Sequence, residues 1–141
     1  MSIPMILAPL FVQVLLTFAV MLGMMHHRTG ALRRGETRFD RIANREPNWP
    51  MRATQFGNSY ANQFELPLLF YVLTILAMAT RHADLAFVLM AWVFVVLRVL
   101  QAFTHVTSNN VRMRGAYFGA SALVLLIMWI IFIVRIMLRL P

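Results

Sequence analysis

The chain has 141 residues, of which 60% are hydrophobic and only 13% are charged, and its mean hydropathy is +0.70. In a soluble domain roughly a quarter of the residues are charged, so the low share here indicates a protein surrounded by lipid, and the length suits a single domain. The sequence contains no cysteine, which excludes disulfides, thiolate metal sites and cysteine nucleophiles. The net charge is +8, and every basic residue apart from histidine is an arginine. We interpret these arginines as loop residues that orient the protein in the membrane, and not as a nucleic-acid-binding surface.

Four stretches are long enough to supply the roughly 20 apolar residues that cross a hydrocarbon core. The first covers residues 3–25, and we expect it to remain as a membrane span because it lacks the basic start and the cleavage site of a signal peptide. The others cover residues 51–79, 83–106 and 114–138. The predicted fold class is an all-α integral membrane protein with a four-transmembrane-helix bundle, and residues 1–141 form one membrane domain.

The segment 26–50 is the one long loop, interrupted by Gly30 and Gly35 and closed by Pro47 and Pro50. This loop, its flank and the turn before the last span carry nine arginines, whereas three lie on the opposite side of the membrane. The positive-inside rule therefore predicts cytoplasmic basic loops and both termini outside. The nine are Arg28, Arg33, Arg34, Arg38, Arg41, Arg45, Arg52, Arg112 and Arg114.

Polar and charged side chains within the second and third spans follow helical spacing, which places each set on one helical face. These side chains are Gln55, Asn58, Asn62 and Glu65 on the second span and Arg98, Gln101 and His105 on the third. A polar side chain in hydrocarbon is costly, so each stripe needs a partner or a ligand. Pro67, just after the first stripe, predicts a kink in the second span.

Two interpretations of these stripes stay open. In the structural one, Glu65 and Arg98 form a buried ion pair and the amides join neighbouring helices. In the functional one, the stripes and the basic rim form a cavity for an anionic ligand, open to water at one end and to lipid at the side. Tyr117 is either a further ligand contact or an interfacial aromatic, and we interpret His26 and His27 as interfacial residues without a metal.

Three segments resemble the MAPEG family, the membrane-associated proteins of eicosanoid and glutathione metabolism. Residues 62–67, Asn-Gln-Phe-Glu-Leu-Pro, resemble the family's Asn-x-x-Glu signature followed by proline. Residues 98–105 are similar to its Arg-x-x-His-x-x-x-Tyr pattern, and residues 110–117 resemble its basic start of helix four. With the length, the four spans and the long basic loop, the resemblance covers nearly the whole chain. The chain resembles bacterial-type members of the family, so we expect the protein to lie in a bacterial inner membrane.

The resemblance implies a homotrimer that binds glutathione between neighbouring subunits near the cytoplasmic face. It implies that an arginine at the start of helix four stabilises the glutathione thiolate, and Arg114 matches best, with Arg112 as the alternative. A hydrophobic small molecule or lipid would reach this nucleophile from the bilayer. The implied glutathione-binding residues are Gln55, Asn58, Asn62, Glu65, Arg98, Gln101, His105 and Tyr117.

The chain also departs from the family pattern. Catalytic members usually carry arginines on helix two, where this chain has Gln55 and Asn58, and Gln101 and His105 replace a histidine and a tyrosine. Amides supply no charge, and charge-assisted hydrogen bonds are roughly twice as strong as neutral ones. Three functions therefore stay open. They are a glutathione-dependent transferase or peroxidase, a non-catalytic lipid-binding or partner-presenting protein of the same fold, and a small transporter or proton-coupled channel that uses Glu65, Arg98 and His105 as a relay.

Overall fold

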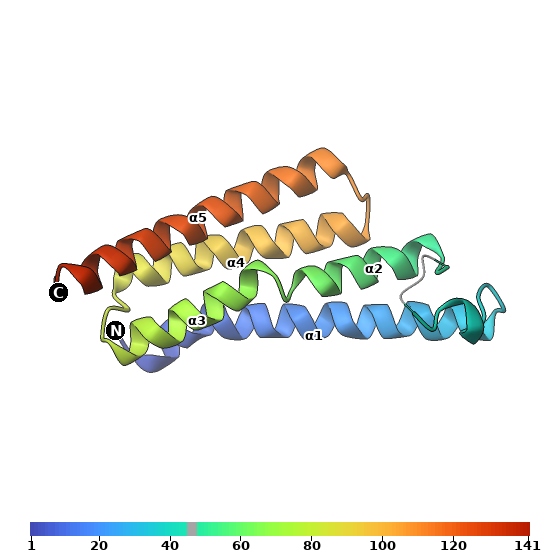
Figure 1. Ribbon diagram of the computed structural model, residues 1–141, viewed down its shortest axis with the longest axis horizontal. Helices are drawn as coiled ribbons and strands as arrows, with labels where there is room; N and C mark the ends of the chain where they lie inside the picture. Colours follow the sequence, from blue (N-terminus) through green and yellow to red (C-terminus); the bar gives the residue numbers. More distant parts are fainter. Residues whose placement is uncertain (45–47) are drawn as a thin grey trace.

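A computed structural model describes residues 1–44 and 48–141, and these residues form helices and connecting turns without a β-strand (Figure 1). Four spans in the described chain are long and apolar enough to cross a membrane, and the predicted four-helix membrane fold is confirmed. Arg45 and Pro47 of the predicted loop lie outside the described residues. The helices are α1 (Ile3–Arg33), the short 3-10 helix η1 (Phe39–Arg41), α2 (Met51–Asn62), α3 (Leu66–Ala79), α4 (Leu85–Val106) and α5 (Val111–Met137).

Helix α1 continues past residue 25, where we predicted the first span to end. Its 31 residues make a rod about 46 Å long at about 1.5 Å per residue, well beyond the roughly 30 Å of hydrocarbon. The helix is therefore longer than the apolar run that predicted it. The helix ends just before Gly35, whose φ of 71° suits a glycine. Gly30 lies inside the helix and does not interrupt it.

The second span is broken into two helices in place of the single predicted helix over residues 51–79 (Figure 1). Helix α2 ends at Asn62 and α3 begins at Leu66, with Glu65 at the N-cap of α3. Pro67 lies in the first turn of α3. In an unbroken helix it would have no N–H to donate to the carbonyl four residues earlier, and its ring would clash with that carbonyl. The kink predicted from Pro67 is therefore a full helix break.

Side-chain caps set where the last two helices begin. Asp84 caps α4 by accepting a hydrogen bond from the backbone N–H of Phe87 at 3.0 Å. Asn110 caps α5 by accepting from the N–H groups of Arg112 at 3.1 Å and Met113 at 3.3 Å. Such caps satisfy N–H groups that have no partner inside the helix. The observed starts, Leu85 and Val111, replace the predicted residues 83 and 114.

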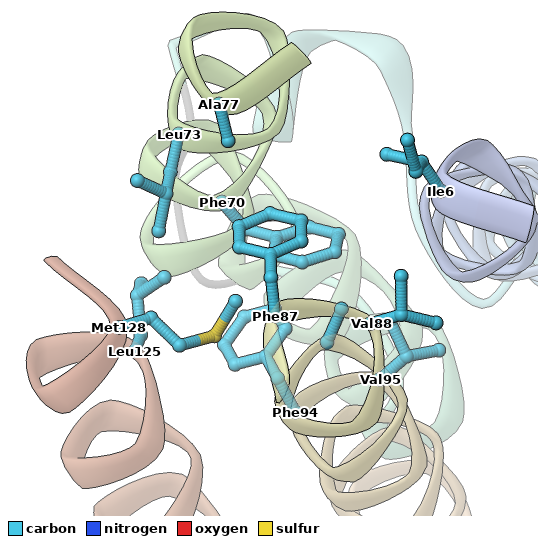
Figure 2. Packing of buried hydrophobic residues seen from close by; sticks show 11 residues of the cluster. Ile6, Phe70, Leu73, Ala77, Phe87, Val88, Phe94, Val95, Leu125 and Met128 are labelled. Atoms are coloured by element: carbon cyan, nitrogen blue, oxygen red, sulfur yellow. The ribbon is translucent and has the colours of Figure 1, made fainter. Parts of the chain in front are cut away.

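The apolar core lies between α3, α4 and α5, and Ile6 of α1 joins it (Figure 2). The rings of Phe70 on α3 and Phe94 on α4 stack with centroids 4.8 Å apart, and both side chains are fully buried. Leu125 and Met128 of α5 pack against the same cluster. Phe70 lies about one turn into α3, so this packing holds the helix break in place against α4.

A buried amide pair joins α1 to the end of α2. The Nε2 of Gln13 donates to the Oε1 of Gln63 at 2.8 Å, and the Nε2 of Gln63 donates to the backbone carbonyl of Ser59 at 3.0 Å. Gln13 is 0% exposed and Gln63 is 2% exposed. Because neither amide reaches water, the pair fixes the rotation of α1 against α2.

We expect Gln13→Leu to lower the free energy of unfolding by about 1–3 kcal/mol, because it leaves the buried oxygen of Gln63 without a donor. The double variant Gln13→Leu/Gln63→Leu should recover part of this loss, since both polar groups are then removed. A double-mutant cycle on unfolding in detergent micelles measures this coupling. Strictly additive losses would contradict an energetic link between the two amides.

Candidate functional site

The turn between α4 and α5 determines the position of Arg114. Asn109 has a φ of 51°, a left-handed conformation that asparagine tolerates better than most residues. Its N–H donates to the carbonyl of Thr104 at 2.7 Å, which ties the turn to the end of α4. Its Oδ1 accepts a hydrogen bond from the Nη1 of Arg114 at 2.7 Å. The guanidinium of Arg114 is thus held toward α4.

A cavity of about 480 Å³ lies between α2, α4 and α5 beside the helix break. This volume is within the range of small-molecule sites, roughly 300–1,000 Å³. Six of the predicted site residues line it, from two separate spans and the start of α5. The lining consists of Asn58, Ala61, Asn62, Glu65, Gln101, His105, Val111, Arg114, Gly115 and Phe118.

The cavity contains polar groups that lack partners in the part of the chain that the structure describes. Gln101 and His105 are buried, and neither the Oε1 of Gln101 nor the Nδ1 of His105 makes a hydrogen bond there. Buried polar groups are normally satisfied, because leaving one unpaired is costly. With the carboxylate of Glu65 and the guanidinium of Arg114, the cavity offers complementary groups to a ligand that carries both charges.

Arg98 does not line this cavity, and the ion pair with Glu65 that the structural interpretation expected is not formed. The side chain of Arg98 is 0% exposed, and its Nη2 donates to the backbone carbonyl of Asn62 at 3.0 Å. Among the described residues, no salt bridge joins Arg98 to Glu65. The last carbonyls of a helix have no partner within it, so the break at Asn62 supplies the acceptor that the guanidinium uses.

Gln55 also lies outside the cavity, which corrects the predicted single stripe on the second span. Gln55, Ser59 and Gln63 are all buried and repeat every four residues, whereas Asn58 and Asn62 line the cavity. Helix α2 therefore has two polar faces, one packed inside the bundle and one facing the cavity. The four-residue spacing from Gln55 to Gln63 is the sequence signal that could have separated them.

The remaining candidate residues lie elsewhere. Arg112 is exposed and Tyr117 is half-buried, and neither lines the cavity. His26 and His27 contact each other edge-on with ring centroids 5.2 Å apart, and His27 stacks on Phe56 at 4.8 Å. No group of three or more metal-binding side chains occurs among the described residues. The two rings lie within α1, and that of His27 packs against Phe56 of α2.

A second, apolar cavity of about 450 Å³ lies between α3 and α5. Its lining begins next to the polar cavity, since Leu66 follows Glu65 and Ala122 lies one turn after Phe118. The sequence did not reveal this cavity. It is lined by Leu66, Leu69, Ala122, Leu125, Leu126 and Trp129.

A family model for the MAPEG family matches residues 6–134 of this chain. The match includes every residue that lines the two cavities. The chain belongs to the MAPEG family. The resemblance to this family that the sequence showed is thus confirmed. This MAPEG protein is a multi-pass membrane protein with four candidate spanning segments. No curated protein and no solved structure matched the chain in the other two comparisons.

Proposed function

We propose that this MAPEG protein is a glutathione-dependent transferase or peroxidase that acts on hydrophobic electrophiles. The observation that carries the proposal is the presence of Glu65 and Arg114 in one cavity between three helices. Glutathione carries an ammonium group, two carboxylates and a thiol. Glu65 would accept from the ammonium group, the amides of Asn58 and Asn62 would bind the peptide part, and Arg114 would lie beside the sulfur.

The chemistry assigned to Arg114 is stabilisation of the thiolate. A nearby cation lowers the pKa of a thiol and raises the fraction of the nucleophilic form. The thiolate then attacks the electrophilic carbon, a carbon–sulfur bond forms, and the displaced electron pair leaves with the leaving group or with an epoxide oxygen that takes a proton from water. The hydrogen bond from Arg114 to Asn109 holds the guanidinium before the ligand arrives, which is the preorganisation that electrostatic catalysis requires.

The apolar cavity supports a hydrophobic second substrate. It is lined by hydrocarbon side chains and Trp129, and it begins at Leu66, directly after the carboxylate residue of the polar cavity. A ligand with an apolar chain would lie between α3 and α5 and present its reactive carbon toward Arg114. Holding both reactants in place in this way supplies a large part of catalysis in bimolecular reactions.

A non-catalytic lipid-binding protein of the same fold is the second candidate. The observation that favours it is the charge of the polar cavity, because Arg114 is the one arginine in its lining among the described residues. Asn58 occupies a helix-two position where catalytic members of the family would supply a cation. The two functions differ in whether millimolar glutathione binds.

We also propose that the protein is a homotrimer with its basic loops in the cytoplasm and both termini outside. Large apolar side chains such as Leu15, Phe18, Leu126 and Ile130 are exposed on α1 and α5, which leaves broad surfaces for other copies and for lipid. Light scattering of the detergent-solubilised protein, corrected for bound detergent, tests the number of chains. A monomer at high protein concentration would contradict the trimer.

Glutathione binding to the purified protein, measured by calorimetry, tests the transferase function directly. We expect saturable binding in the wild type and binding at least about tenfold weaker in Glu65→Gln, because a hydrogen bond to a charged group contributes roughly 1.5–3 kcal/mol. Glu36→Gln is the matched control, since Glu36 is exposed, pairs with Arg34 and lies outside the cavity.

The control variant should bind glutathione like the wild type. Equal weakening in both variants would contradict the assignment of the ammonium group to Glu65. An absence of binding at millimolar glutathione in the wild type would reject the transferase function for this chain and favour the lipid-binding alternative.

A further inference from the structure

The end of the bundle that holds the loop after α1 carries a cluster of arginines, which we call the arginine rim and define as Arg28, Arg33, Arg34, Arg38, Arg41 and Arg52. Only two acids, Glu36 and Asp40, lie among these six arginines in the described residues. Glu36 is bound to Arg34, with Nε and Oε1 2.7 Å apart. This hydrogen bond lowers the pKa of Glu36, so Glu36 stays charged and neutralises Arg34 alone.

Arg28 of the arginine rim lies against the ring of Trp49. Its guanidinium carbon lies 5.0 Å from the ring centroid of Trp49, a cation–π distance. It also lies close to Gly57 of α2, where an added Cβ would come to 3.0 Å from its Nη2 and the guanidinium would have to shift slightly. Arg28 has no salt bridge or hydrogen bond to another described side chain, and its Nε is buried without a partner. A planar cation is thus placed beside Trp49 without a hydrogen bond to the residues that the structure describes.

Apolar side chains stand exposed beside these cations. Phe39, in η1 between Arg38 and Arg41, is 75% exposed, and Met51 at the start of α2 is also 75% exposed. Exposed apolar side chains flanked by arginines are typical of segments that lie in a membrane interface, where the apolar groups enter the acyl region and the cations meet phosphates. The rod of α1 extends beyond the hydrocarbon thickness, which places Arg28 and the loop near the headgroups.

We propose that the arginine rim is a binding surface for anionic phospholipid headgroups, with the guanidinium of Arg28 as its ordered contact to a headgroup phosphate. Arginine suits this role because its planar fork donates two hydrogen bonds to phosphate oxygens and stays charged at every physiological pH. The uncompensated positive charge favours lipids with a net negative headgroup over zwitterionic ones. This site is separate from both cavities and does not depend on the glutathione proposal.

Quenching of Trp49 fluorescence by brominated lipids tests the proposal locally. In the parent protein for this experiment, Trp92→Phe and Trp129→Phe are introduced into the full chain, so that Trp49 is the one tryptophan left. This protein is reconstituted into vesicles of phosphatidylcholine and phosphatidylglycerol. Brominating one lipid and then the other gives the relative affinity of the two at this position. We expect phosphatidylglycerol to bind about fivefold or more tightly, since one basic residue near an anionic surface contributes about that factor.

Three variants make the test specific. Arg28→Gln and Arg33→Gln should each lower the preference for phosphatidylglycerol about fivefold. Arg33 is exposed and its side chain forms no hydrogen bond or salt bridge with the described residues, so its variant remains informative if Arg28→Gln disturbs Trp49. Arg81→Gln, which removes an exposed charge at the opposite end of the bundle, should leave the preference unchanged. Raising the salt concentration should weaken the preference in the parent, because exposed charges are screened.

Equal quenching by both lipids in the parent protein would overturn the proposal. An equal loss of preference in Arg81→Gln would also overturn it, because the effect would then follow net charge and not this surface. Added inorganic phosphate should not displace the brominated lipid, and displacement would show a site for free phosphate in place of a lipid surface.

Discussion

Replacing Arg114 with alanine is expected to lower glutathione-dependent turnover at least about 100-fold, with a smaller effect on the affinity for the hydrophobic substrate. Arg114 is the cation that lines the polar cavity, and its guanidinium is held by Asn109 before the ligand binds. Removing one preorganised group that stabilises developing negative charge typically costs 100- to 1,000-fold in rate. Conjugation of glutathione to a chromogenic aryl halide in proteoliposomes measures the turnover.

Arg112→Ala is the matched control for this experiment. It removes the same side chain two residues earlier, from an exposed position outside the cavity. Its turnover should stay within about twofold of the wild type, and ultraviolet absorbance of the bound thiolate should persist in Arg112→Ala and disappear in Arg114→Ala. The reverse pattern would assign the thiolate to Arg112, the alternative that the sequence left open.

A second large effect is expected in the core, where Phe70→Ala should lower the free energy of unfolding by about 3–5 kcal/mol. Phe70 is fully buried and stacks on Phe94, so its removal leaves a cavity that the surrounding helices fill only in part. Phe103→Ala, which truncates a phenylalanine that is 66% exposed on α4, should cost about 0.5 kcal/mol or less.

Unfolding of both variants in the same detergent micelles measures this difference. Because Phe70 lies just after the helix break, Phe70→Ala should also weaken glutathione binding in the fraction that stays folded. Equal losses in Phe70→Ala and Phe103→Ala would show that buried and exposed phenylalanines contribute equally to the free energy of unfolding. That result would contradict a core centred on Phe70.

The spans and the approximate place of the site could be predicted from the sequence because both rest on local signals. Long apolar runs report the hydrocarbon thickness directly, and Pro67 marks a break because its ring and missing N–H act within one turn of its own helix. The cavity side chains at Asn58, Asn62, Gln101 and His105 were likewise visible as helical repeats.

The contacts between helices could not be predicted in the same way. One interpretation of the stripes paired Glu65 with Arg98, whereas Arg98 donates to the carbonyl of Asn62 at the helix break, which also accepts from the N–H of Glu65. The bond between Gln13 and Gln63 depends on the rotation of α1 against α2, which no spacing within either segment specifies. Gln55 was misplaced for the same reason, since a span with polar residues on two faces looks like one broad stripe.

The turn between α4 and α5 has a consequence for how this chain can tolerate insertions and deletions. Each residue of an α-helix advances its side chain about 100° around the axis, so the residue two places before Arg114 points nearly the opposite way. The cap at Asn110 and the left-handed Asn109 set the starting angle of α5. One uncharged residue added between Asn110 and Arg114 would therefore turn the guanidinium away from the cavity, although the span would still be apolar, long enough to cross a membrane and of the same net charge. The length of this connection is as much a part of the site as the arginine itself.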